Sequence, residues 1–118
     1  MKISYVIAFV SDLEKARKFY TEKLGLSVTE EIPDEQSLTF DIENVKFGVH
    51  VPSEKNRHNI GKSTGILFYV DDVKKAHGEL SARGVTFIKA PDTDAGPDRK
   101  DLAVFVDDDK NEYGLTNE

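Results

Sequence analysis

With 118 residues, the chain is long enough for one hydrophobic core but not for two independent ones. Its hydrophobic fraction of 38% and charged fraction of 32% are typical of a folded, water-soluble protein, and no apolar run approaches the roughly 20 residues that cross a bilayer. A net charge of −6 argues against a nucleic-acid partner, and the lack of cysteine excludes disulfides, thiolate metal ligands and cysteine nucleophiles.

The first half of the chain predicts a strand, a helix and three further strands. Residues 3–10 are rich in β-branched and aromatic side chains and indicate a strand in place of a signal peptide, so we expect a cytoplasmic protein. Ser11 or Asp12 then caps a helix that runs to about residue 24. Its apolar stripe consists of Leu13, Ala16, Tyr20 and Leu24. Strands are expected at 26–31, 37–42 and 45–51, with turns at 33–35 and 43–44.

The second half predicts the same order of elements. Residues 52–63 are polar, show no helical or strand period, and indicate a surface linker. A strand at 65–70 and a helix at 72–83 follow, and the inward side chains of this helix are Val73, Ala76, His77 and Leu80. The remaining strands are expected at 85–90, 102–106 and 112–116, with a loop at 91–100 and a turn at 107–111.

The two halves are also related residue by residue. The segment VSDLEKA at 10–16 returns as VDDVKKA at 70–76, and Phe47-Gly48-Val49 corresponds to Tyr113-Gly114-Leu115. Such internal repetition fixes the architecture of a chain. The sequence therefore predicts one domain over 1–118, made of a first βαβββ module at 1–51, the linker at 52–63 and a second βαβββ module at 64–118.

These segments resemble those of the vicinal oxygen chelate superfamily, which includes glyoxalase I, bleomycin-resistance proteins and extradiol dioxygenases. The resemblance lies in residues 10–16 with Phe19-Tyr20 and Leu24-Gly25-Leu26, and in residues 107–115, an altered form of the ending Asp-Pro-Asp-Gly-Asn-x-x-Glu-Leu. It implies an α+β fold in which the two modules form an open, cup-shaped mixed sheet. It also implies a homodimer in which each cup lies between two chains.

In many members of that superfamily the cup holds a metal ion on His or Glu side chains from the first and fourth strands of each module. Carried onto this chain, the four positions fall at Tyr5, Gly48, Gly65 and Gly114, and none is a usual donor for a divalent metal. The resemblance therefore indicates a metal-free variant, and we expect no cofactor. The glycines would leave open the space where metal ligands otherwise stand, which favours a cavity.

Strand alternation predicts which side chains line the cup. His50 shares the side of Gly48 and is the one candidate catalytic residue, as a hydrogen-bonding group or general base; its alternative is a strand-end histidine without a role. The other expected ligand-binding residues are Tyr5, Ile7, Phe9, Leu67, Tyr69 and Glu112. They suit an apolar or aromatic ligand, although side chains that simply fill the core would give the same pattern.

Other residues favour structural interpretations. His58 is expected to be exposed in the linker, and His77 to pack in the core. Asp107, Asp109 and Asn111 imitate the start of a calcium loop, but Glu112 stands where that loop needs glycine, so a solvated hairpin turn is the better interpretation.

Three functions remain open. The first is a metal-free protein that binds a small apolar or aromatic molecule without chemistry, as in the bleomycin-resistance branch. The second is a metal-dependent lyase, similar to lactoylglutathione lyase, or a dioxygenase, with displaced ligands. It would need His50 together with at least two side chains from the set Glu112, Asp41, His58 and Glu118. The third is a dimerisation module with no ligand.

Overall fold

The computed structural model describes residues 1–43, 45–94 and 98–118. The strands are β1 (Tyr5–Phe9), β2 (Val28–Ile32), β3 (Ser37–Phe40), β4 (Lys46–His50), β5 (Ser63–Tyr69), β6 (Thr86–Lys89), β7 (Leu102–Val106) and β8 (Glu112–Thr116). The helices are α1 (Leu13–Lys18) and α2 (Val73–Ala82), with a π-helical segment η1 (Phe19–Lys23) and two 3-10 segments, η2 (Pro33–Glu35) and η3 (Glu54–Asn59).

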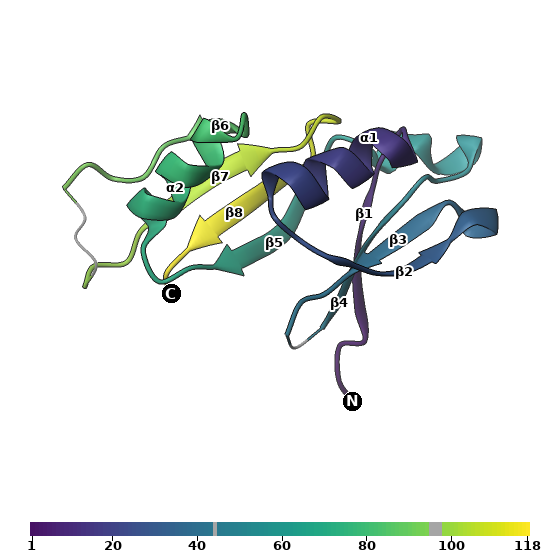
Figure 1. The fold of residues 1–118 in the computed structure, drawn as a ribbon, viewed down its shortest axis with the longest axis horizontal. Helices are drawn as coiled ribbons and strands as arrows, with labels where there is room; N and C mark the ends of the chain where they lie inside the picture. The colour runs from purple at the N-terminus through teal and green to yellow at the C-terminus, as the bar shows by residue number, and fades with distance from the viewer. Residues whose placement is uncertain (44, 95–97) are drawn as a thin grey trace.

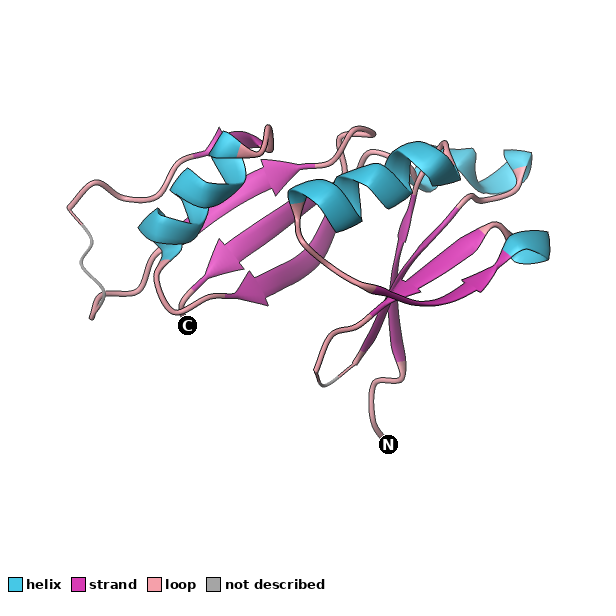
Figure 2. Ribbon diagram, in the orientation of Figure 1, coloured by secondary structure: helices cyan, strands magenta, loops and turns pink. Residues whose placement is uncertain are grey.

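The strands form two four-stranded sheets, ordered β1-β4-β3-β2 and β5-β8-β7-β6 (Figure 1). β1 runs parallel to its neighbour β4, and β5 runs parallel to its neighbour β8. All other neighbouring strands are antiparallel. The predicted α+β class with two βαβββ units is therefore confirmed. Figure 2 shows the sheets side by side, with α1 and α2 along one side of the molecule.

Both helices begin as their sequences predict. The side chains of Asp12 and Asp72 each accept a hydrogen bond of 3.1 Å from the backbone three residues on, which satisfies an otherwise unpaired N–H of the first turn. The helices are followed by Gly25 and Gly84, whose φ values of 80° and 93° lie in the left-handed region that glycine tolerates best.

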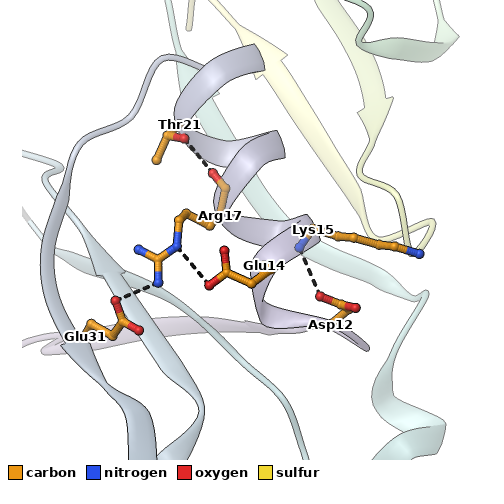
Figure 3. A network of polar contacts seen from close by, with 6 residues as sticks. All are labelled: Asp12, Glu14, Lys15, Arg17, Thr21 and Glu31. Atoms are coloured by element: carbon orange, nitrogen blue, oxygen red, sulfur yellow. Dashed lines mark hydrogen bonds and ion pairs between the residues drawn. The ribbon is translucent and has the colours of Figure 1, made fainter.

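The expected continuous α-helix to about residue 24 is wrong in its second half. The α-helix ends at Lys18, and the next five residues form the wider π turn of η1, in which Phe19 and Tyr20 are both buried. On the outer side of α1, Arg17 is held between Glu14 and Glu31, so that its guanidinium ties the helix to β2 (Figure 3).

The remaining differences from the predicted elements are small. Strand ends move by one or two residues. The linker, expected without helical structure, contains η3, whose side chains are exposed as expected for a surface segment. The predicted turn at 43–44 and loop at 91–100 lie partly outside the described residues, at 44 and 95–97.

The larger of two hydrophobic core clusters draws on both modules, and the smaller joins α2 to β7 and β8 through Val73, Ala103 and Leu115. Aromatic rings join the two modules in the larger cluster: Phe47 of β4 packs edge-on against Phe68 of β5 and Tyr113 of β8, with centroids 5.6 and 6.0 Å apart. Tyr20, which is fully buried, packs on Tyr113 as well. The modules are therefore joined through their helix-covered sides.

The opposite, helix-free faces of the two sheets are named here the first and second open faces. Strand alternation and register place Tyr5, Ile7, Phe9, Ser37, Thr39, Lys46, Gly48 and His50 on the first. They place Leu67, Tyr69, Leu102, Val104, Glu112 and Gly114 on the second. Several large apolar side chains there are exposed to solvent, which is unusual for a sheet face of this composition.

Candidate functional site

The first open face carries four of the predicted site residues, three of them in two cross-strand pairs and the fourth between these pairs. Tyr5 lies opposite Lys46, whose Nζ is 5.2 Å from the centre of the Tyr5 ring, a cation–π distance. Phe9 lies opposite His50, with ring centres 6.1 Å apart. Ile7 lies between these pairs, opposite Gly48. The face thus combines aromatic and aliphatic surface with one amine and one imidazole.

His50 lies at the edge of a cavity of about 420 Å³ at the end of β1 and β4. Phe9, Pro52 and Val51 give this cavity an apolar side, and polar side chains from η2 and η3 give the rest. Gln36 at its rim adopts a left-handed backbone conformation, with φ of 49°, which is uncommon for a residue with a side chain. His50 is half-buried and is positioned to donate or accept a hydrogen bond here.

The second open face carries the other three predicted residues. Leu67 lies opposite Gly114, and Tyr69 lies two pairs further along the strands, opposite Thr116. The Tyr69 hydroxyl donates a hydrogen bond of 2.8 Å to Asp71, and this bond raises the pKa of the phenol. Glu112 lies at the start of β8, opposite Ser63.

A groove of about 960 Å³ separates the modules, and Leu67 and Tyr69 are on its β5 wall. Its first-module wall includes Val6, Leu26 and Phe47. The structure thus groups the predicted site residues in two sets, Tyr5, Ile7, Phe9 and His50 on one face and Leu67, Tyr69 and Glu112 on the other. It does not bring the two sets together within one chain, because the modules are joined through their helix-covered sides.

A buried polar cluster joins the modules, and the sequence did not predict it. The Tyr20 hydroxyl donates to Asp107 at 2.7 Å and lies 2.6 Å from the Tyr113 hydroxyl, which therefore donates to Tyr20. The side-chain amide of Asn111 bonds both Asp107, at 2.8 Å, and the Phe9 carbonyl of β1, at 2.7 Å. We call Tyr20, Asp107, Asn111 and Tyr113 the junction cluster.

Burial governs the acidity of the junction cluster. It raises the pKa of both phenols, most strongly that of Tyr20, because a phenolate there would lose its hydration beside another phenol and a carboxylate. Burial also raises the pKa of Asp107, against the opposing effect of hydrogen bonds from Asn111 and Tyr20. The cluster is therefore a set of satisfied hydrogen bonds with no group poised to titrate as a tyrosinate near neutral pH.

A comparison with known protein families covers both modules. The model of the Glyoxalase/Bleomycin resistance protein/Dioxygenase superfamily matches residues 2–115. The chain belongs to this superfamily.

Among similar proteins, YurT of Bacillus subtilis (strain 168), described as uncharacterized, is 34% identical over 119 aligned positions, which cover 91% of each chain. The crystal structure of UcmS2 has a TM-score of 0.84 at 25% identity, covering 100% of this chain and 98% of that one. A superfamily member from Sphaerobacter thermophilus DSM 20745 has a TM-score of 0.79 at 29% identity, with the same coverage. These neighbours support the α+β fold described above.

The four positions at which the resemblance predicts metal ligands do not fit a metal ion. Tyr5 offers only a phenol, and Gly48, Gly65 and Gly114 offer no side chain. Among the described residues, no group of three or more His, Asp or Glu side chains is close enough to share an ion. The donor set that metal-dependent chemistry needs is therefore lacking at these positions.

The expectation that the glycines open a cavity is wrong at two of the three positions. A Cβ at Gly114 would lie 2.8 Å from Leu67 Cγ, and a Cβ at Gly48 would lie 2.9 Å from the Leu38 carbonyl. Their space is already taken by neighbouring atoms. Only Gly65 faces open space, and its φ of 72° in an irregular part of β5 gives a backbone reason for glycine.

The expected solvation of the turn at 107–111 is wrong for its first and last residues, although Asp108 and Lys110 between them are exposed. Asp107 and Asn111 are 5% and 2% exposed, because their side chains form the junction cluster and do not face solvent. Asp109 accepts hydrogen bonds from the backbone and side chain of Ser11, which fastens the same turn to the first module.

The remaining histidines lie as expected. His58 is exposed in η3, and His77 packs its ring 4.4 Å from that of Phe87.

Among the described residues, no helix is long and apolar enough to cross a membrane.

Proposed function

We propose that the protein binds a small apolar or aromatic molecule, without a metal ion, in a cup that two copies of the chain form together. One observation carries the proposal: Tyr5, Ile7, Leu67 and Tyr69 are 42%, 49%, 57% and 64% exposed on the open faces. Side chains of this size are seldom left in water on a sheet face unless a ligand or partner covers them.

The partner in this proposal is a second copy of the chain. The junction cluster holds the two open faces of one chain apart, so a closed cup needs the second open face of another chain. Charge complementarity supports this pairing, because Lys46 on the first face and Glu112 on the second occupy equivalent places in the two modules. We also propose that 1–118 is a single domain, since its core and junction cluster are shared by both modules.

The proposal includes a cytoplasmic location, which a chain without cysteine suits because it has no disulfide to form.

The proposal assigns no reaction to the protein. His50 is the one imidazole on the open faces, and its place beside Phe9 supports a role in hydrogen bonding a polar group of the ligand.

Light scattering and dye titration test the proposal together. We expect a dimer in solution that binds the neutral dye phenylnaphthylamine saturably, because an enclosed apolar cup raises the fluorescence of such a dye. A dimer that does not bind the dye would instead favour the dimerisation module. A protein that stays monomeric would contradict the shared cup.

Elemental analysis distinguishes the metal-dependent alternative. After incubation with zinc, nickel, manganese or iron salts and gel filtration, we expect only substoichiometric metal, because the four superfamily positions lack donors. A stoichiometric ion that is lost in His50→Asn or Glu112→Gln would contradict the proposal. Surface binding would instead persist in both variants.

A further inference from the structure

The inference begins at Gly114, where the superfamily places a metal ligand. The side chain of Leu67 lies directly over this glycine, since a Cβ built there would be 2.8 Å from Leu67 Cγ and 3.3 Å from Leu67 Cδ2. Leu102 of β7 also approaches it, with its Cδ1 3.3 Å from the same point. Val104 is opposite Gly114 in the register of β7 and β8. The position that lacks a donor therefore has two leucine side chains in contact and a valine beside it.

The equivalent position of the first module is built differently. The atoms nearest to a Cβ at Gly48 would be the carbonyl oxygen of Leu38 at 2.9 Å and the hydroxyl oxygen of Thr39 at 3.8 Å. The nearest neighbours of the added Cβ are therefore polar atoms at Gly48 and aliphatic carbons at Gly114. The two open faces, although related by the internal repeat, present different chemistry at corresponding points.

We propose that Leu67 is a specificity-determining residue of the cup. With Leu102 and Val104 it forms an aliphatic platform over Gly114 that receives an uncharged apolar group of the ligand, a ring or a branched alkyl group. A charged or strongly hydrated group at this point would lose its water without gaining a hydrogen-bond partner. This inference rests on the proposed function, because it names the part of the ligand that the second open face contacts.

The exposure of Leu67 supports the platform. Its inner side packs on Gly114, yet 57% of the residue faces solvent, so the outer side is available for contact. Ile88 of β6 is also 57% exposed and lines neither the cavity beside His50 nor the groove beside Leu67. It offers a matched control for the loss of an exposed aliphatic side chain.

The test compares Leu67→Asn, Leu67→Met and Ile88→Asn with the wild-type dimer in titrations with phenylnaphthylamine. Asparagine keeps the branched shape and the number of non-hydrogen side-chain atoms of leucine but removes its apolar surface, so we expect Leu67→Asn to weaken binding about tenfold or more. Leu67→Met keeps an apolar side chain and should bind within about threefold of wild type. Ile88→Asn should leave the affinity unchanged.

Each outcome has a defined meaning. If Leu67→Asn remains a folded dimer and binds the dye as tightly as wild type, the platform is wrong and the proposed function stands. If Leu67→Asn and Ile88→Asn weaken binding equally, the effect is general, and the inference is likewise overturned. If the wild-type dimer does not bind the dye, the proposed function fails and the inference fails with it.

A second titration uses the anionic dye anilinonaphthalenesulfonate. We expect it to bind more weakly than the neutral dye, and stronger binding would contradict an apolar platform.

Discussion

Glycines 48 and 114 occupy the same place in the two modules, but they are needed for different reasons. At Gly48 the obstacle to a side chain is the backbone carbonyl of Leu38 on the neighbouring strand. At Gly114 it is the side chain of Leu67. A backbone obstacle can be relieved only by moving β4 away from β3, whereas a leucine can change its rotamer.

The first residue-scale prediction follows from this difference. Gly48→Ala should lower the free energy of unfolding by about 1–3 kcal/mol, because the added methyl group forces two paired strands apart. Gly114→Ala should cost less, and adding Leu67→Ala should remove its cost. Urea unfolding of the single and double variants measures both effects, with Gly48→Ala plus Leu67→Ala as the control pair. Equal costs for the two glycines, or no relief by Leu67→Ala, would contradict the geometry.

Residue positions on the open faces could be predicted from the sequence, because strand alternation depends only on the order of residues. The reasons for the glycines could not. They depend on which atoms of a neighbouring strand approach, and that is fixed by register and side-chain rotamers. The sequence therefore placed Leu67 on the correct side of β5 but gave no sign that it covers Gly114.

At the scale of single elements, α1 is fastened to its sheet by charge as well as by its apolar stripe. Arg17 NH2 lies 2.6 Å from Glu31 of β2, and both side chains are about one-third exposed (Figure 3). These hydrogen-bonded contacts with Glu31 and Glu14 raise the pKa of the guanidinium, which stays protonated throughout the accessible pH range.

A double-mutant cycle of Arg17→Ala and Glu31→Ala should give a coupling of about 0.5–1 kcal/mol, the upper part of the range for partly exposed pairs, because the contact is short and the guanidinium is held on two sides. The coupling should shrink in high salt. Lys100 and Glu118, which are 77% and 62% exposed, provide the control pair, for which we expect no measurable coupling. A coupling that is equal in the two pairs would contradict a structural role for Arg17.

Element order, type and most boundaries could be predicted, since capping residues, hydrophobic periods and turn formers all lie close together in the sequence. The π turn of η1 could not. A π turn follows the same apolar spacing as the end of an α-helix, and here it buries Phe19 and Tyr20 together, with Tyr20 packed on Phe47 of the first module and Tyr113 of the second. These contacts are distant in the sequence, and so is the pairing of β5 with β8, whose irregular register also escaped prediction.

For the whole molecule, the decisive feature is the junction cluster, because it fixes how the two modules are joined. A signal for it was present in the sequence. Tyr20 lies in the apolar stripe of the first predicted helix, and a buried phenol needs a hydrogen-bond partner. The partners could not be named, since Asp107 and Tyr113 are 87 and 93 residues away along the chain.

The junction cluster gives a prediction for alkaline pH. Burial raises the pKa of Tyr20 and Tyr113 in the folded state above the value of about 10 that a phenol has in an unfolded chain. The stability that depends on these protonated phenols is therefore fully present below pH 10 and is lost as the pH rises, because only the unfolded state can then release the protons. Each such phenol should lower the free energy of unfolding by about 1.4 kcal/mol per pH unit above pH 10.

Tyr20→Phe isolates this effect. At neutral pH the variant should be about 1–3 kcal/mol less stable than wild type, because Asp107 loses a donor and the Tyr113 hydroxyl loses its acceptor. As the pH rises toward about 11, the difference should narrow, since wild type alone retains the buried Tyr20 phenol. Chemical unfolding at a series of pH values measures the difference, and Tyr5→Phe, on the exposed first face, gives the baseline for loss of a tyrosine outside the junction. A difference between wild type and Tyr20→Phe that stays constant to about pH 11 would show that Tyr20 ionises as freely in the folded protein as in the unfolded chain, and the buried junction would then be wrong.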